Sequence, residues 1–380
     1  MKKISVLIGT RPEAIKMAPV ILEARNYDNI TIELCSTGQH TSMLTGALKA
    51  FGLEPNFKLD VMRPGQSLGS LTALLLDQVT EYLSKSKPDL VLVHGDTTSA
   101  MIGALAAFYA TIPVGHVEAG LRTGNVLSPF PEEFNRKSIS LTAKYHFAPS
   151  NGAAKALKNE GVNSKHIHVT GNTVIDALLE TVSKFTDESK VSLNMRNHFT
   201  QILGFSPENI NFILITAHRR ENWDEGIIKI CNAIKRLALL NSDFKFIYPV
   251  HLNPNIRKVV HRELFSINNV FLIPPQDYEE FSWLLLHSYF LLTDSGGIQE
   301  EAPALGKPVL VMRDSSERPE AISYGTAMLV GSDPKKIIES CQLLINDSTL
   351  YNKMASATNP YGNGTASKQI LKVLKDEDRY

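Results

Sequence analysis

The feature that most constrains the fold is an alternation of short runs rich in β-branched residues with longer amphipathic stretches. This alternation predicts βα units and a parallel sheet. It occurs in two blocks, one before residue 171 and one from residue 211. The predicted strands are 4–8, 30–36, 90–93, 113–117, 145–148 and 167–170, followed by 212–216, 244–249, 270–273, 290–292, 309–311 and 328–330. We therefore expect an α/β protein with two Rossmann-like doubly wound domains and a cleft between them.

The boundary between the two domains follows from the same pattern. We expect the first domain to span residues 1–170 and the second to span residues 171–364. A Gly/Asn turn at residues 361–364 precedes an amphipathic stretch at about 365–380, which we expect to fold back on the first domain as a helix. The first helix of the chain should lie between Pro12 and Pro19, with Thr10 as its cap.

The charge and cysteine content excludes several classes of protein. The chain has 39 Lys and Arg against 39 Asp and Glu, which argues against a nucleic-acid or acidic-membrane binder. Cys35, Cys231 and Cys341 are far apart with no CxxC pair, which argues against a zinc ribbon or disulfide framework and favours a reducing compartment. The apolar run after the N-terminal lysines is too short for a signal peptide, so we expect a cytoplasmic protein without membrane segments.

A phosphate site is predicted directly after the first strand. Gly9 allows a tight turn, the helix N-terminus offers free N–H groups, and Arg11 adds a positive fork for phosphate. Lys16 follows one turn later. The alternative is a surface ion pair between Arg11 and Glu13.

Three carboxylates follow strands or begin helices in the first block. Asp96 and Glu118 each follow a strand, and Glu132 begins a helix together with Glu133. Each has a purely structural alternative, because Asp96 can cap the next helix and acids in a first turn are favoured by the helix dipole. Converging carboxylates raise one another's pKa, so as a set Asp96, Glu118 and Glu132 indicate general acid–base chemistry.

The strongest single motif is Ser295-Gly296-Gly297, which follows a strand and begins a helix. Its consecutive N–H groups and its hydroxyl suit phosphate oxygens. Glu301, four residues after Gly297, is placed to accept hydrogen bonds from the hydroxyls of a ribose.

Two histidines also follow strands in the second block. His218 and Arg219 lie where a diphosphate or sugar would bind, although a solvated charged turn is the alternative. His251 is read as a capping or core histidine.

The chain has no GxGxxG, Walker A, HExxH or GxSxG motif, which argues against a dinucleotide dehydrogenase, a P-loop ATPase, a zincin and an α/β-hydrolase. The remaining features suggest a nucleotide-sugar enzyme.

At this point the motifs resemble a known family, the non-hydrolysing UDP-N-acetylglucosamine 2-epimerases. The segments that carry the resemblance are Gly9 to Lys16, His94 to Thr97, His116 to Thr123, Pro131 to Glu133, Gly171 to Asp176, Thr216 to Trp223, Asp294 to Pro303 and Glu317 to Glu320. The resemblance implies a glycosyltransferase-B type fold, a cytoplasmic homodimer, and interconversion of UDP-GlcNAc and UDP-ManNAc. It implies no redox cofactor and no metal, and a product that supplies ManNAc for surface polysaccharide synthesis.

The resemblance also assigns roles to positions of this sequence. Asp96, Glu118 and Glu132 match the acid/base carboxylates of the family, and His218 matches its catalytic-site histidine. The UDP-binding positions are matched by Arg11, Lys16, His218, Ser295, Gly296, Gly297 and Glu301. The implied reaction is an anti elimination of UDP to 2-acetamidoglucal followed by a syn re-addition. Which carboxylate removes the proton and which returns it stays open, because coupled acids do not reveal this in a sequence.

A second, allosteric substrate site is implied for many bacterial members. Gln39, Glu132, Arg219 and His251 match its positions. Two positions depart from some members of the family: Ser42 replaces a longer amide and Gly65 replaces an arginine, so the strength of activation is left open.

Two alternatives of other classes share the same features. A glycosyltransferase of the same fold would require an acceptor, and a nucleotide-sugar sensor would bind without turnover. The hydrolysing relatives of the epimerases would release free ManNAc.

Overall fold

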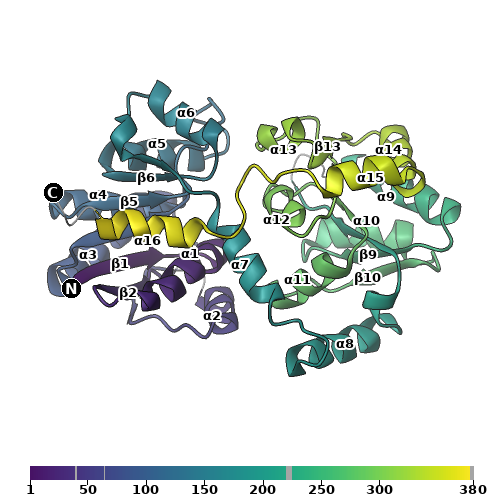
Figure 1. Ribbon diagram of the computed structural model, residues 1–380, viewed down its shortest axis with the longest axis horizontal. Coiled ribbons are helices and arrows are strands. Elements are labelled where there is room, and N and C mark those ends of the chain that lie inside the picture. Colours follow the sequence, from purple (N-terminus) through teal and green to yellow (C-terminus); the bar gives the residue numbers. More distant parts are fainter. Residues whose placement is uncertain (39–40, 64, 220–224, 377–380) are drawn as a thin grey trace. The chain divides into compact units, whose positions relative to one another are not determined.

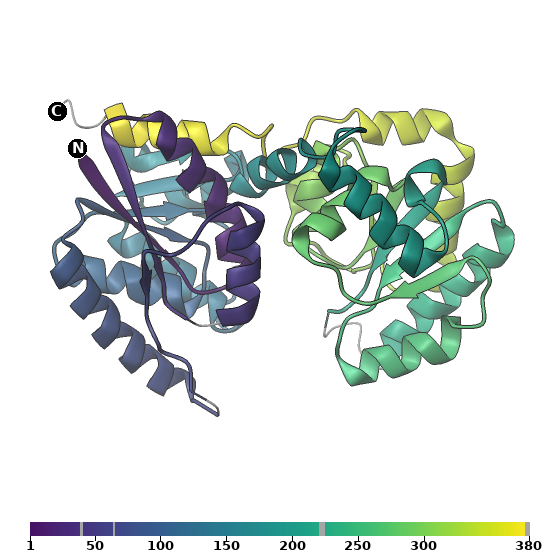
Figure 2. The same cartoon turned by 90° about the horizontal axis from the view of Figure 1, so that it is seen from below.

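The protein is described by a computed structural model that covers residues 1–38, 41–63, 65–219 and 225–376. The chain divides into two compact units, Met1–Ala177 with Tyr361–Tyr380, and Leu178–Pro360. The first unit thus contains residues 171–177 and 361–364, which we expected in the second domain. Each unit is an α/β layer structure with its own parallel sheet, as predicted (Figures 1 and 2).

The sheet of the first unit has seven strands in the order β3-β2-β1-β4-β5-β6-β7, and all neighbours are parallel. The strands are β1 (Lys2–Ile8), β2 (Ile30–Ser36), β3 (Phe57–Lys58), β4 (Leu90–His94), β5 (Val114–Val117), β6 (Tyr145–Ala148) and β7 (Ile167–Val169). Central strands such as β4 are buried along their whole length, because helices cover both faces of a parallel sheet.

The helices of the first unit connect these strands, except for the helix that follows β7 and runs past Ala177 into the second unit, and for the C-terminal helix. They are α1 (Arg11–Glu23), α2 (Thr41–Ala50), α3 (Leu68–Ser86), α4 (Thr98–Tyr109), α5 (Glu132–Thr142), α6 (Asn151–Asn159), α7 (Thr173–Val182) and α16 (Ala366–Asp376), with 3-10 turns Ala24–Asn26 and Ser164–His166. The core between α3, α4 and the sheet is formed by residues such as Val79, Leu83, Val91 and Ala104. Burial of these side chains supplies the main driving force for folding of this unit.

The sheet of the second unit has six parallel strands in the order β10-β9-β8-β11-β12-β13. They are β8 (Phe212–Thr216), β9 (Lys245–Pro249), β10 (Val270–Ile273), β11 (Phe290–Thr293), β12 (Val309–Val311) and β13 (Ala327–Leu329). The helices are α8 (Lys190–Leu203), α9 (Glu225–Leu240), α10 (Pro254–Leu264), α11 (Tyr278–His287), α12 (Ile298–Ala304), α13 (Pro319–Ser323), α14 (Pro334–Asn346) and α15 (Ser348–Ala355), with a 3-10 turn Pro207–Asn209.

The C-terminal helix belongs to the first unit, as the sequence predicted. In Figure 1 the yellow helix α16 lies beside α1, and the two helices are in contact. Asp176 on α7 fixes its beginning, because the carboxylate accepts hydrogen bonds from the backbone N–H groups of Ala366 (3.2 Å) and Ser367 (2.8 Å). The carboxylate therefore caps α16 from another helix.

Two expectations about the elements of the first unit are wrong. The strand β3 was not predicted, because two exposed residues are too few to show an alternation of apolar and polar side chains. Pro19 does not end the first helix but lies buried within α1, which continues to Glu23. Thr10 is the N-cap as predicted, and Glu13 completes a capping box with it.

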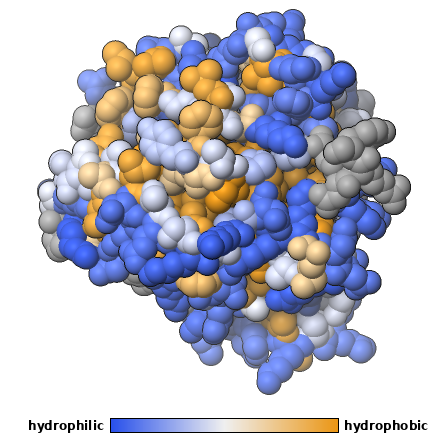
Figure 3. All heavy atoms as spheres, turned by 90° about the vertical axis from the view of Figure 1, so that its left-hand side faces the viewer, coloured by the Kyte–Doolittle hydropathy of each residue, from blue (hydrophilic) through white to orange (hydrophobic). Residues whose placement is uncertain are grey.

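Within the described ranges, no helix is both long enough and apolar enough to cross a bilayer. The face of the first unit seen in Figure 3 is mostly hydrophilic, with hydrophobic patches between the polar side chains.

Candidate active site

The predicted site residues follow the strands at the centre of each sheet. In the first unit the strand order reverses between β1 and β4, and in the second between β8 and β11. Ligands of doubly wound sheets bind at the carboxyl ends of the strands near such switch points. The loops after β1, β4 and β5, and those after β8, β9 and β11, are therefore the ones that matter.

Glu13 is a buried structural carboxylate and does not form an ion pair with Arg11 on the surface. Its Oε2 accepts hydrogen bonds from the N–H groups of Gly9 (2.9 Å) and Thr10 (2.7 Å) and from the Thr10 hydroxyl (2.8 Å). Its Oε1 accepts from the Thr97 hydroxyl (2.7 Å). Burial raises the pKa of Glu13, and these hydrogen bonds oppose part of that rise. The carboxylate thus ties the loop after β1 to the loop after β4 and leaves Arg11 half-buried at the start of α1.

Glu118 is held by residues from three other elements. Lys16 on α1 forms an ion pair with its Oε2, Asn172 at the start of α7 donates a hydrogen bond to the same oxygen (2.7 Å), and His94 Nε2 lies 3.7 Å from it. Glu118 itself has a left-handed backbone (φ 63°), which is uncommon for a residue with a side chain. Lys16 therefore points toward the carboxylates.

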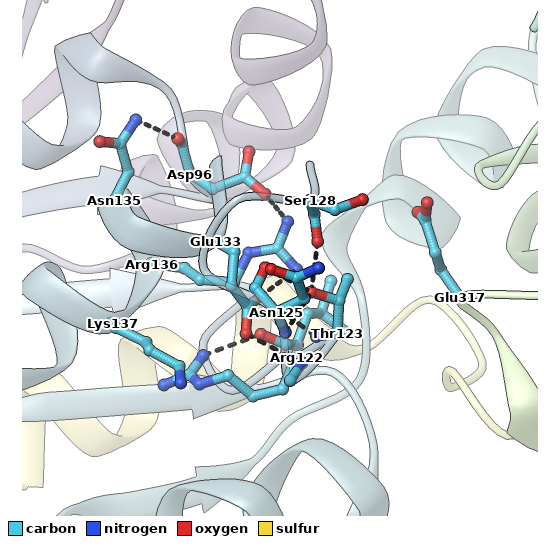
Figure 4. Close-up of polar contacts among 12 residues, drawn as sticks. Asp96, Arg122, Thr123, Asn125, Ser128, Glu133, Asn135, Arg136, Lys137 and Glu317 are labelled. Atoms are coloured by element: carbon cyan, nitrogen blue, oxygen red, sulfur yellow. Dashed lines mark hydrogen bonds and ion pairs between the residues drawn. The ribbon is translucent and has the colours of Figure 1, made fainter. Parts of the chain in front are cut away.

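Asp96 does not cap helix α4, contrary to one of our two interpretations. Thr97 is the N-cap, and its side chain accepts from the Ala100 N–H (3.0 Å). The carboxylate of Asp96 instead forms an ion pair with Arg136 on α5, and its backbone carbonyl accepts from Asn135 (2.9 Å; Figure 4). Helix α5 therefore fixes both the backbone and the side chain of Asp96.

The other two predicted carboxylates act electrostatically on Asp96. Burial raises the pKa of Asp96, Arg136 opposes this rise, and Glu118 and Glu132 add to it. Lys16 also opposes it. The charges of Glu118, Glu132 and Lys16 thus all act on Asp96, whose carboxyl group holds a proton more readily than in water.

The two adjacent acids of α5 have different surroundings. Glu133 is fully buried and accepts from the N–H groups of Thr123 (3.1 Å) and Gly124 (3.2 Å), so it fixes the loop before α5. Glu132 Oε2 is buried and has no hydrogen-bond partner among the described residues. The structure therefore provides a local role for Glu133 and none for Glu132.

In the second unit, Asp294 supports His218. Its fully buried Oδ2 accepts from the N–H groups of His218 and Arg219 (2.8 Å each), and its Oδ1 lies 3.5 Å from His218 Nδ1. Burial lowers the pKa of His218, and the charges of Arg219 and His251 lower it further. The charge of Asp294 raises it.

His251 is an exposed neighbour of His218 and not a core histidine. Its ring stacks on that of His218, with centroids 5.6 Å apart and an interplanar angle of 10°. Its Nδ1 accepts from the Asn253 N–H (3.1 Å), which fixes the loop after β9.

The Ser-Gly-Gly turn lies between β11 and α12 as predicted. The N–H of Ser295 donates to the Thr293 hydroxyl (2.9 Å). A Cβ added to Gly296 would lie 3.6 Å from Arg219 Nη2, and one added to Gly297 would lie 3.6 Å from Glu301 Oε2. Arg219 thus lies near Gly296 and Glu301 near Gly297, and at these distances a Cβ at either position would make ordinary contacts.

The residues of the predicted second substrate site are described only in part. Gln39 and the side chain of Ser42 lie outside the described residues, as do residues 220–224 of the motif that begins at Thr216. Gly65 is described and has a positive φ of 68°.

Sequence reasoning missed four residues that contact the predicted ones: Asn172, which contacts Glu118; Arg136, which contacts Asp96; His94, which lies near Glu118; and Asp294, which supports His218. Three of them fall inside segments that carried the family resemblance. Arg136 follows the Pro131 to Glu133 segment closely. Among the described residues, no three or more His, Cys, Asp or Glu side chains gather as a set that could hold a metal ion.

Comparisons with known proteins agree with the fold and the motifs. The family model for UDP-N-acetylglucosamine 2-epimerase matches residues 22–375. The UDP-N-acetylglucosamine 2-epimerases of Yersinia pestis and Escherichia coli strain K12 are 48% and 47% identical to the chain, each over 374 residues that cover 98% of this chain and 98% of the relative. The crystal structure of UDP-GlcNAc 2-epimerase from Neisseria meningitidis bound to UDP-GlcNAc has a TM-score of 0.90 and 49% identity, covering 99% of this chain and 100% of that one. The chain therefore belongs to the UDP-N-acetylglucosamine 2-epimerase family and is an isomerase.

Proposed function

We propose that the protein interconverts UDP-N-acetylglucosamine and UDP-N-acetylmannosamine by inverting the configuration at C2 of the sugar. The observation that carries the proposal is the set of carboxylates in the first unit: Glu118 is held by Lys16 and Asn172, Asp96 is held by Arg136, and both Glu118 and Glu132 act on the charge of Asp96. Inversion at a carbon requires one group to remove a proton and another to return it. The Neisseria relative, bound to UDP-GlcNAc, supports the identity of the substrate. Family membership favours this activity over a glycosyltransferase of the same fold and over a sensor.

The reaction proceeds by elimination and re-addition. A carboxylate removes the C2 proton, the electrons of the C–H bond form the C1–C2 double bond of 2-acetamidoglucal, and the C1–O bond breaks to release UDP. In the return step a carboxylic acid delivers a proton to the opposite face of C2 while a phosphate oxygen bonds to C1. The proton lost at C2 and the leaving group are both restored, so no redox cofactor and no metal is required by the balance of the reaction.

UDP is held by groups that stabilise its negative charge. In the second unit these are His218, Ser295, Gly296, Gly297 and, for the ribose, Glu301; in the first unit they are Arg11 and Lys16. The absence of a Cβ at Gly296 and Gly297 suits close approach of a diphosphate to the backbone N–H groups. Departure of the diphosphate is the other half of the elimination, so these groups would stabilise the transition state as well as the bound substrate.

We further propose a second UDP-GlcNAc site, at which substrate activates the enzyme, formed by Gln39, Glu132, Arg219 and His251. Arg219 and His251 both lie beside groups assigned to UDP, since Arg219 flanks Gly296 and His251 stacks on His218. Such a neighbourhood would let a second ligand influence the first. Because Ser42 and Gly65 depart from the residues of some relatives, the strength of activation is not part of this proposal.

The cellular setting is proposed from the same family resemblance. The protein would act as a cytoplasmic homodimer and supply ManNAc for surface polysaccharide synthesis. The three cysteines are free and buried, which suits a reducing compartment.

Proton NMR of UDP-GlcNAc with the enzyme in deuterated water tests the function. We expect UDP-ManNAc to accumulate as the minor species at equilibrium, with deuterium at C2 of the product. Turnover without deuterium at C2 would contradict the elimination. Free ManNAc would instead indicate the hydrolysing reaction, product formed only with an added acceptor would indicate a glycosyltransferase, and binding without any product would indicate a sensor.

A further inference from the structure

The segment Gly171 to Asp176 is part of the family resemblance but has no role in the mechanism above. Asn172 within it follows β7, immediately precedes α7, and is 2% exposed. Its backbone N–H donates to the carbonyl of Tyr361 (2.7 Å). The chain leaves the first unit after Ala177 and returns to it at Tyr361, so Asn172 joins both passages of the chain inside the first unit.

The side chain of Asn172 makes two directional hydrogen bonds. Its Oδ1 accepts from the N–H of Val174 (3.1 Å), which caps the first turn of α7. Because a backbone N–H can only donate, the carbonyl end of the amide must face Val174. The NH2 end is then directed to Glu118, where Nδ2 lies 2.7 Å from Oε2. The start of α7 thus determines which end of the amide the carboxylate meets.

Glu118 is a residue whose position has to be maintained. It has a left-handed backbone and a side chain that is 9% exposed, and both features are costly unless the surroundings compensate. The titratable and charged groups near it include Lys16 on α1, His94 at the end of β4 and Asp96 after β4. Lys16 supplies opposite charge on a flexible stem, whereas Asn172 supplies a donor fixed by a helix cap.

We propose, building on the function above, that Asn172 is a positioning residue for catalysis: its amide fixes the orientation of the Glu118 carboxylate and favours its ionised form. A hydrogen bond donated to a carboxylate stabilises the charged state and restricts the side chain to one rotamer. Asn172 acts through Glu118 and not on the substrate. Loss of the amide donor therefore changes the rate and its pH dependence, while UDP binding by the groups of the second unit is retained.

Two substitutions at this position and one matched control separate this role from a structural one. Asn172→Asp keeps an oxygen for the Val174 N–H but places a second carboxylate against Glu118. Asn172→Ser keeps a cap for α7, because serine is a good N-cap residue, and is too short to reach Glu118. The control is Asp176→Asn, which changes the contact of α7 with α16 and touches no group of the carboxylate set.

The measurements are the pH profiles of kcat and kcat/KM for UDP-GlcNAc epimerisation, the Kd for UDP by calorimetry, and the thermal midpoint of each variant. For Asn172→Asp we expect the acidic limb to move up by about one pH unit or more, because two adjacent carboxylates cannot both ionise readily. We also expect kcat near neutral pH to fall by about 10-fold to 100-fold, with the Kd for UDP changed by less than about threefold. Asn172→Ser should show a smaller shift in the same direction, and Asp176→Asn none.

The outcomes distinguish this inference from the function on which it rests. If the wild-type enzyme incorporates deuterium at C2 but the limbs of both Asn172 variants coincide with that of Asp176→Asn, the positioning role is refuted. A fall in activity that only follows the loss of folded protein, with an unshifted profile, refutes it equally. If the wild-type enzyme itself forms no UDP-ManNAc, the proposed function is what fails.

Discussion

The guanidinium of Arg136 joins two acids of the first unit: one terminal nitrogen contacts the carboxylate of Asp96, and the other lies 3.5 Å from Glu133 Oε2. Arg136 is largely buried, so this contact is less screened by solvent than a surface pair. Among the groups around Asp96 it provides the strongest opposition to the effect of burial on the pKa. The protonation state of Asp96 therefore depends on a residue that the sequence motifs did not single out.

Replacement of Arg136 by glutamine should raise the pKa of Asp96 further and lower the stability of the protein in a pH-dependent manner. Arg136 stabilises the ionised carboxylate, so the loss of stability relative to wild type should be small at a pH below the pKa of Asp96 and should grow as the pH rises through that pKa. Urea unfolding at several pH values measures this. Lys137→Gln is the control, because Lys137 is the next residue of α5 and pairs only loosely with Glu160 (3.8 Å). A pH-independent loss in the Arg136 variant would contradict the argument.

The same substitution should reduce turnover at Glu132 and stability at Glu133. Glu132→Gln should reduce turnover by roughly 10²-fold or more while leaving the Kd for UDP largely intact, because it removes a proton-transfer group without removing a structural contact. Glu133→Gln should instead lower stability by about 1–3 kcal/mol, since each of its oxygens accepts a backbone N–H and an amide nitrogen can replace neither. Steady-state kinetics and urea unfolding of both variants test this. An unchanged rate for Glu132→Gln would remove Glu132 from the acid/base set.

The contrast between these two acids illustrates how far the sequence could lead. The buried strand 212–216 was predicted to the residue, because a short apolar run between turn signals is a strong local pattern. Strand 30–36 was also predicted to the residue, although it is partly exposed and contains Glu33. The loops that carry the site followed from their position after those strands. The pairs Arg136 with Asp96 and Asn172 with Glu118 join residues 40 and 54 positions apart, and no local pattern encodes such a pairing.

Local alternatives were likewise decided only by the three-dimensional structure. A capping role for Asp96 was reasonable on spacing, but Thr97 is one residue closer to the helix and takes the position. The alternative of a surface ion pair between Arg11 and Glu13 was excluded in the same way. The hydrogen bond that Glu13 accepts from Thr97 comes from a loop 84 residues away, so burial of the carboxylate depends on the packing of β1 against β4.

Glu13 should make a pH-dependent contribution to stability that Glu13→Gln abolishes. Burial raises the folded-state pKa of Glu13 above the reference value of 4.5. The contribution of this group is therefore fully present below that reference value and is lost as the pH rises through the raised pKa. A glutamine oxygen can still accept from Gly9 and Thr10, and its nitrogen can donate to the Thr97 hydroxyl. We therefore expect the stability of Glu13→Gln relative to wild type to improve as the pH rises. Urea unfolding across the acidic and neutral range would show parallel curves if Glu13 were not perturbed.

The last prediction concerns His218, whose two neighbours should shift its pKa in opposite directions. Asp294→Asn removes a charge that raises the pKa of His218, so the pKa should fall further below its usual value. His251→Asn removes a neighbouring group that lowers it, and so the pKa should rise; the amide oxygen of asparagine can still accept from the Asn253 N–H. In both variants the asparagine amide oxygen can accept the backbone N–H groups that Asp294 or His251 accepts in the wild type, so the loops should retain their shape. The ring proton signals of His218, followed by NMR as a function of pH in the two variants, measure the shifts. Shifts of the His218 pKa in the same direction in both variants would contradict the electrostatic description of this loop. Because protonated His218 would stabilise the departing diphosphate, UDP should also bind more weakly to Asp294→Asn than to His251→Asn near neutral pH.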